Sequence, residues 1–279
     1  MNGQLHWLQM LALCRDKVQE QIKPHIKTLN QKQPELGIGA GGDPLRQIDL
    51  AAENAIVNTF REYGISFTLI SEESGIRKYG STPGECYVTA DPVDGSTNLM
   101  RGLPFYATSI AISTNPTLNT IHTALVTDLF HGVTYTAQRG RGAYRNNQRI
   151  EPSKVSSLEE AVIGVDLNTY KIQEIVPRII GLMQKTKHIR HLGANALELC
   201  YVADGTTDAF VDIRGKLRTT DMAAAWLIAK EAGAKMTTPE GKPLKARLNP
   251  KQTLAFVTCA NQAIHEAILG LIRPEKEKP

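Results

Sequence analysis

The chain begins with two stretches in which apolar residues recur every three or four positions, the spacing of one face of a helix. In residues 5–25 these positions are Leu11, Cys14, Val18 and Ile22. In residues 45–63 they are Ile48, Ala52, Ile56 and Phe60, and Gly64 follows as a natural helix end. The pattern predicts two amphipathic helices, separated by a glycine-rich loop over 33–42.

From residue 65 the pattern changes to short apolar and β-branched runs, which are typical of strands. The first two runs, 65–70 and 86–90, both stop at acidic residues. Clusters of Asn, Pro, Asp and Gly separate the next runs, which are 107–113, 121–126, 132–137 and 140–144. Such short connections predict an antiparallel meander.

The second half of the chain alternates between the two patterns. Strands are predicted at 161–165, 188–192, 208–213 and 253–259. Helices are predicted at 172–183, 194–203 and 220–232, and Asn261 is expected to cap a final helix that ends near 272, before a charged, frayed tail over 273–279. This alternation indicates a layered α/β arrangement. The polar cluster at 151–157 suggests an N-terminal α+β domain over 1–152 and a C-terminal α/β domain over 153–279.

Composition limits the possible functions. With 279 residues and 42% hydrophobic content, the chain can bury one large core or two modest ones. The net charge of +4 is spread without a Lys/Arg block, which favours anionic small molecules over nucleic acid as partners. The four cysteines lack metal-binding spacing and indicate reduced thiols. No membrane span or signal peptide is predicted, so a soluble, cytoplasmic protein is expected.

The strand predicted at 86–90 runs directly into Asp91-Pro-Val-Asp94-Gly95-Ser96-Thr-Asn98. Two carboxylates three residues apart could converge on one hard cation. Gly95 lets a ligand approach the backbone, and the N–H groups that follow would face an anion if a helix begins there. Metal-assisted phosphoryl chemistry would use this combination, but an Asx-rich surface turn uses the same residue types.

Other acidic residues lie at the ends of predicted elements. Asp49 and Glu53 are one helical turn apart, a repulsive spacing unless a cation is near, although Glu53 could equally lie on a solvated helix face. Glu72 and Glu73 follow the strand at 65–70, where exposed glutamates are common. Asp221 lies at a helix start with Thr219 or Thr220 as the expected N-cap, where charge stabilisation of the helix would also explain it.

Four segments, in order, resemble the inositol monophosphatase family of metal-dependent, lithium-sensitive phosphatases. They are Asp43 to Glu53, Ser71 to Ser74, Asp91 to Asn98 with Leu103-Pro-Phe105, and Thr220 to Gly233. The resemblance covers most of the chain. It implies an α-β-α-β-α layered sandwich like that of inositol monophosphatase and fructose-1,6-bisphosphatase, a homodimer, and a mobile loop before Asp43 that closes over the metals.

The same resemblance implies roles for individual residues. The metal ligands would be Glu72, Asp91, the carbonyl of Val93, Asp94 and Asp221, holding two or three Mg²⁺ ions, with Mn²⁺ as a substitute. Asp49 and Ser96 would orient and deprotonate the attacking water, with Glu72 as a further catalytic residue. The N–H groups of Gly95 and Ser96 would hold the phosphate, and Glu73 and Asp43 would support the site.

The substrate is less specified by the motifs. Asp212 lies where the family's acidic residue contacts sugar or inositol hydroxyls. The basic stretch from Asp212 to Arg218 resembles archaeal members that hydrolyse both inositol-1-phosphate and fructose-1,6-bisphosphate, and Arg214 and Arg218 could bind a second phosphate or form a solvated basic turn. Two alternatives stay open: a phosphatase for 3′-phosphoadenosine 5′-phosphate or NADP, and a catalytically silent regulatory homologue that binds a phosphorylated ligand. Arg46 departs from the small hydroxyl residue of many relatives, which leaves the third metal and lithium sensitivity unspecified.

Overall fold

The computed structural model describes residues 7–27, 36–169 and 171–272. The expected helix start at residue 5, the first part of the glycine-rich loop and the tail after 272 lie outside these residues. Among the described residues, no helix is both long enough and apolar enough to cross a bilayer.

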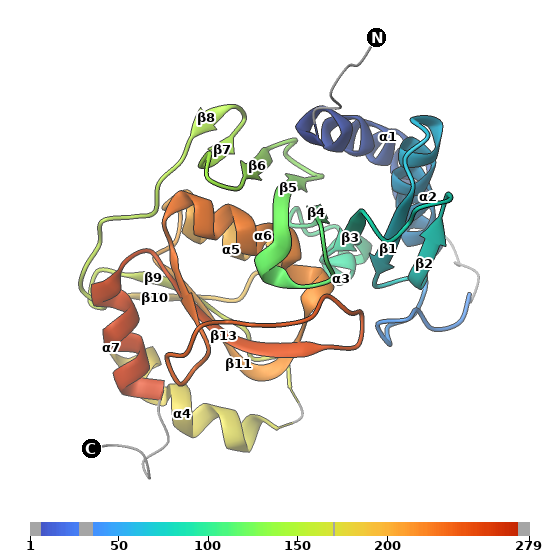
Figure 1. Cartoon of the computed structure of the whole chain (residues 1–279). Helices are drawn as coiled ribbons and strands as arrows, with labels where there is room; N and C mark the ends of the chain where they lie inside the picture. The colour runs from blue at the N-terminus through green and yellow to red at the C-terminus, as the bar shows by residue number, and fades with distance from the viewer. Residues whose placement is uncertain (1–6, 28–35, 170, 273–279) are drawn as a thin grey trace.

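The elements form five layers, helices alternating with sheets (Figure 1). An outer pair, α1 (Trp7–Lys27) and α2 (Gln47–Glu62), covers one face of the first sheet. A middle pair, α5 (Asn195–Ala203) and α6 (Thr219–Ala232), separates the first sheet from the second. The last layer contains α4 (Ile172–Lys185) and α7 (Gln262–Ile272). The predicted α-β-α-β-α sandwich is confirmed.

The first sheet has eight strands in the order β2-β1-β3-β4-β5-β6-β7-β8. Their bounds are β1 Phe67–Ser71, β2 Gly75–Tyr79, β3 Tyr87–Asp94, β4 Ala107–Ser113, β5 Ile121–Asp128, β6 Thr134–Gln138, β7 Ala143–Arg145 and β8 Gln148–Arg149. From β3 onward each strand pairs antiparallel with the next, as the pattern predicted. Strand β2 was not predicted, because its central residues are polar and exposed.

The second sheet has five strands in the order β10-β9-β11-β13-β12. The strands are β9 Val162–Val165, β10 His188–Arg190, β11 Ala209–Arg218, β12 Lys235–Thr237 and β13 Thr253–Cys259. Because β9, β10 and β11 run parallel, their carboxyl ends meet at one edge of the sheet. Strand β11 continues through the basic stretch, which is therefore strand with an irregular register rather than a turn.

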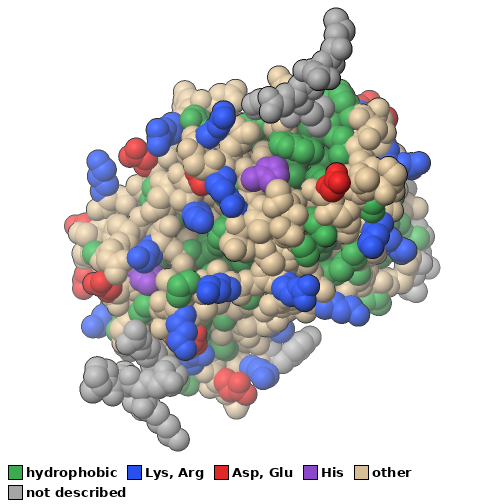
Figure 2. All heavy atoms as spheres, viewed as in Figure 1, with side chains coloured by type: hydrophobic (Ala, Val, Ile, Leu, Met, Phe, Trp, Pro, Cys, Tyr) green, Lys and Arg blue, Asp and Glu red, His purple; other side chains and the backbone are tan. Residues whose placement is uncertain are grey.

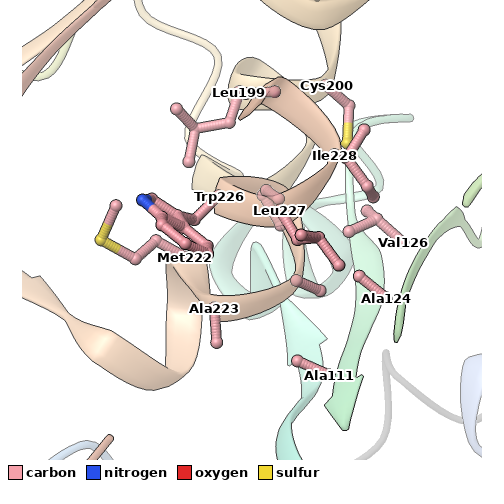
Figure 3. Close-up of a cluster of buried hydrophobic side chains, with 14 of the residues drawn as sticks. Ala111, Ala124, Val126, Leu199, Cys200, Met222, Ala223, Trp226, Leu227 and Ile228 are labelled. Atoms are coloured by element: carbon pink, nitrogen blue, oxygen red, sulfur yellow. The ribbon is translucent and has the colours of Figure 1, made fainter. Parts of the chain in front are cut away.

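The middle layer packs tightly because α6 is rich in alanine. Its residues from Thr219 to Ala229 are all buried. Figure 3 shows Ala223, Leu227 and Ile228 of α6 near Ala124 and Val126 of β5. One hydrophobic cluster thus joins the central helices to the first sheet. The division at residue 152 stays a prediction: the two sheets fall on either side of it, but α5 and α6 pack between them.

Candidate functional site

Three carboxylates meet at the point where two parallel strands end. Glu72 directly follows β1, Asp91 lies in β3, and Asp221 lies in the first turn of α6. In the pairing of β1 with β3, Ser71 lies opposite Ala90, so the next residues along each strand are neighbours. One carboxylate oxygen from each of the three residues lies within 4.8 Å of the others. The fold brings together acidic residues that are far apart in the sequence.

This cluster needs a positive charge. Asp91 is 2% exposed, and burial raises its pKa well above the usual range, with the charges of Glu72 and Asp94 raising it further. Burial likewise raises the pKa of Glu72, and the charge of Asp221 adds to the effect. Oxygen-only ligands at this spacing suit a hard divalent cation, so the donor set fits a metal site.

Asp94 connects the motif to the second half of the chain. Its carboxylate accepts hydrogen bonds from the backbone N–H groups of Asn195 (3.2 Å) and Ala196 (2.7 Å) at the start of α5. Burial raises the pKa of Asp94 to about 8, with the charge of Asp221 adding to the shift. The next residue, Gly95, has φ +83°, and a Cβ there would lie 2.9 Å from the Ala194 Cβ, so glycine is required. Asp94 is therefore fixed beside the acidic cluster.

Three residues beside Asp94 have roles that stay predictions. Val93 is buried between the two aspartates, and its carbonyl remains a predicted ligand. Ser96 begins the short helix α3 (Ser96–Arg101), which confirms that a helix starts in the motif. The N–H groups of Gly95 and Ser96 remain the predicted phosphate contacts.

Asp49 has one unpartnered oxygen in a buried position. It lies in the first turn of α2, where its Oδ2 accepts the Arg46 backbone N–H at 3.1 Å, while Oδ1 is buried with no hydrogen-bond partner. Burial raises the pKa of Asp49 to about 6. In the described part of the chain, no hydrogen bond joins Asp49 to Ser96. The geometry leaves Oδ1 available to accept a proton or a hydrogen bond.

Two more glutamates surround Asp49. Glu53 is 5% exposed and accepts the Ser74 backbone N–H at 3.2 Å, so the solvated-face interpretation of Glu53 is wrong. Burial raises the pKa of Glu73 to about 8, and the charges of Asp49 and Glu53 add to the effect. The adjacent glutamates after β1 are partly buried rather than exposed.

Arg218 supplies positive charge to the cluster. Its guanidinium lies 2.7 Å from Glu72 Oε1, 2.7 Å from Asp43 Oδ2 and 3.3 Å from Asp221 Oδ2. It also donates to the Gly41 carbonyl at 3.0 Å, and a Cβ on Gly41 would lie 2.8 Å from the guanidinium. Arg218 thus attaches the glycine-rich loop to the acidic cluster. It also corrects the N-cap of α6: the cap is Arg218, whose backbone N–H donates to Asp221, and neither Thr219 nor Thr220.

Arg214 is held by two other carboxylates. Its Nη2 lies 2.5 Å from Asp166 Oδ2 and 2.6 Å from Asp212 Oδ2, and its side chain is 6% exposed. Because Arg214 and Arg218 both have carboxylate partners, a second substrate phosphate would compete with those partners. The second-phosphate role stays a prediction.

We expect Arg214→Ala to destabilise the protein by roughly 3 kcal/mol, because it leaves Asp166 and Asp212 buried without a cation. The measurement is urea unfolding in Mg²⁺-free buffer. The control is Arg190→Ala, which removes an exposed guanidinium whose only hydrogen bond among the described residues goes to the neighbouring Ile189 carbonyl. Equal stability of the two variants would contradict the structural role.

A cleft of about 410 Å³ lies beside Asp43, Arg218 and Asp221. Its wall includes Asp166, Asn168 and His191, which sequence reasoning did not single out, whereas Asp212 is fully buried and does not line it. Asp166 directly follows β9 and His191 directly follows β10. The rule applied to Glu72 and Asp91, that ligands gather at carboxyl ends of neighbouring strands, would have found them.

Comparisons with known proteins agree with this geometry. The family model described as the inositol monophosphatase family matches residues 8–277. A protein of Methanothermobacter thermautotrophicus named fructose-1,6-bisphosphatase/inositol-1-monophosphatase is 34% identical, with 95% of each chain covered. A Methanococcus maripaludis protein named bifunctional NADP phosphatase/NAD kinase is 31% identical over 95% of this chain, which spans about half (49%) of that relative.

Among solved structures, one described as an inositol monophosphatase–fructose 1,6-bisphosphatase superposes with a TM-score of 0.85 at 29% identity, covering 96% of this chain and 100% of that one. The predicted family is confirmed, and with it a phosphatase fold from a metal-dependent family. The chain belongs to the inositol monophosphatase family.

Proposed function

We propose that this protein is a Mg²⁺-dependent phosphomonoesterase that hydrolyses sugar or inositol phosphates. The observation that carries the proposal is the convergence of Glu72, Asp91 and Asp221 within 4.8 Å, beside a cleft open to a small molecule. Glu72, Asp91, Asp94 and Asp221, with the Val93 carbonyl, would hold the metal. When bound, Mg²⁺ supplies charge stabilisation of the phosphate and a water of lowered pKa.

The chain's own residues would orient the reactants. Asp49 Oδ1 would accept a hydrogen bond from the attacking water or from the Ser96 hydroxyl, since it has no other described partner. The N–H groups of Gly95 and Ser96 would hold the phosphate oxygens. Ser96 as a nucleophile is disfavoured, because no His or Lys base accompanies it in the motif.

Ser96→Ala should therefore lower kcat by roughly 10²-fold and leave KM within about threefold, because orientation of the water matters in the transition state. The test compares kcat and KM of this variant with those of Thr97→Ala, which removes the neighbouring, exposed hydroxyl. An increase in KM alone would withdraw the water-orienting role from Ser96.

The sugar-facing wall supports a polyol phosphate. Asp166, Asn168 and His191 offer polar groups to hydroxyls at the cleft, and Asp212 would act on the substrate only through Arg214. The relatives named for fructose-1,6-bisphosphate and inositol-1-phosphate favour these substrates. The relatives named as NADP phosphatases favour NADP as the second candidate.

The test is phosphate release from fructose-1,6-bisphosphate, inositol-1-phosphate, 3′-phosphoadenosine 5′-phosphate and NADP, each with Mg²⁺, with Mn²⁺ and with EDTA. Turnover of the first two only with a divalent ion is the expected result. Turnover of the nucleotides alone would keep the site and replace the substrate. Silence on all four would favour the regulatory homologue. The homodimer and the cytoplasmic location stay predictions.

A further inference from the structure

A second cavity of about 890 Å³ lies against the C-terminal half of α6, β12 and the segment that follows β12. This volume is within the usual range of small-molecule sites. None of its lining residues lines the acidic cleft. The cavity therefore needs an explanation separate from phosphate hydrolysis.

Apolar side chains form part of this cavity. Among them are Trp226, Met236 and Leu244, and Trp226 is 7% exposed. In Figure 3, Trp226 leaves α6 on the side turned away from Ala124 and Val126 of β5. The indole is thus the one large aromatic group at a wall that can receive another flat ring.

Positive charges accompany this apolar wall. The cavity lining includes Lys230, Lys235, Lys245 and Arg247 but no Asp or Glu. Within the described chain, none of these four side chains forms an ion pair, and the Lys230 ammonium lies 4.9 Å from the Trp226 ring centroid. Figure 2 shows Lys and Arg side chains scattered among apolar areas over one face of the molecule.

An adjoining cavity of about 610 Å³ has the same charge character. It shares Arg247 and Gln252 with the first, adds Lys78 and Lys251, and is also lined without a carboxylate. Unpaired cations on two joined cavities make the local potential positive, which attracts anions.

We propose that the larger cavity binds a small aromatic anion: a planar apolar ring beside Trp226 and Met236, with its phosphate, sulfonate or carboxylate held by Lys245 and Arg247. A ring covers apolar surface, and guanidinium and ammonium groups satisfy the anion with charge-assisted hydrogen bonds. Sugar phosphates fit less well, because the apolar wall offers few partners for their hydroxyls. Thr219, two residues before Asp221, donates its backbone N–H to the Gln252 carbonyl at 2.9 Å, so the cavity wall is attached to the helix that carries a site carboxylate.

The test uses 1-anilinonaphthalene-8-sulfonate as a fluorescent probe of the native protein, in EDTA and below the unfolding transition. We expect one saturable site per chain. Lys245→Glu and Arg247→Glu should each raise the probe Kd at least tenfold, because each reverses a charge at the anion. The matched control is Lys242→Glu, an exposed residue of the same segment that does not line the cavity, and its Kd should not change.

A second comparison separates charge from apolar binding. N-phenyl-1-naphthylamine has the same ring system without the sulfonate and should bind at least tenfold more weakly. Equal binding of the two probes, equal loss in the Lys242→Glu control, or many sites per chain would overturn the proposal. Loss of the probe site in Asp91→Asn would place it in the acidic cleft and would also overturn the proposal.

Discussion

Asp91→Asn is expected to lose hydrolysis by at least roughly 10³-fold, the equivalent of about 4 kcal/mol of transition-state stabilisation, and at the same time to raise the stability of the metal-free protein. The carboxylate of Asp91 is buried beside Glu72, Asp94 and Asp221, and their repulsion disfavours its charge. Within the described residues it forms no side-chain hydrogen bond that asparagine would break. Removing the charge relieves the repulsion and removes a metal ligand together.

The measurement pairs turnover with thermal unfolding, each with Mg²⁺ and with EDTA. In EDTA the variant should unfold at a higher temperature than the parent, and Mg²⁺ should raise its unfolding temperature less than it raises that of the parent. The matched control is Asp208→Asn, at the opposite end of β11 from the cleft, where the carboxylate accepts the Val162 N–H at 2.7 Å. That variant should lose stability and keep its turnover. Parent-like turnover of Asp91→Asn would refute the metal-ligand role.

The metal-free protein is expected to lose stability as pH rises, and Mg²⁺ should reverse the loss. Burial raises the pKa of Glu73 from 4.5 to about 8, that of Asp94 from 3.8 to about 8 and that of Asp49 from 3.8 to about 6. Between each pair of values the folded chain holds protons that the unfolded chain has released. Stability is therefore greatest below the unfolded pKa and falls as pH increases, by about 1.4 kcal/mol per pH unit for each proton difference.

Urea unfolding in EDTA at a series of pH values from 5 to 8.5 measures this slope. With saturating Mg²⁺ the slope should reverse, because a cation favours the ionised carboxylates that bind it. Asp94→Asn should show a shallower fall in EDTA than the parent, since one of the three groups no longer titrates. A flat profile in EDTA would mean that the carboxylates keep their ordinary pKa values and do not form a repulsive cluster.

The sequence by itself determined the layers and the family. Periodicity predicted α1, α2 and the meander from β3 to β7, because side chains alternate between core and solvent at the repeat of each element. It failed for β2, whose polar residues carry no such signal, and for the three-residue β12. The acidic residues at the ends of predicted elements identified Glu72, Asp91, Asp94 and Asp221, because the chain reverses there and exposes polar groups at a common edge.

Only the tertiary structure decided how the charges are paired. The basic stretch before Asp221 looked free to bind a second phosphate, yet Arg218 contacts Asp43, 175 positions earlier in the chain, and Arg214 contacts Asp166 across the cleft. Likewise, Asp166 and His191 became cleft residues only when β9 and β10 were aligned as parallel neighbours. Local sequence records which face of an element is buried, whereas ion pairs depend on which distant elements pack together, and packing of the whole chain sets those distances.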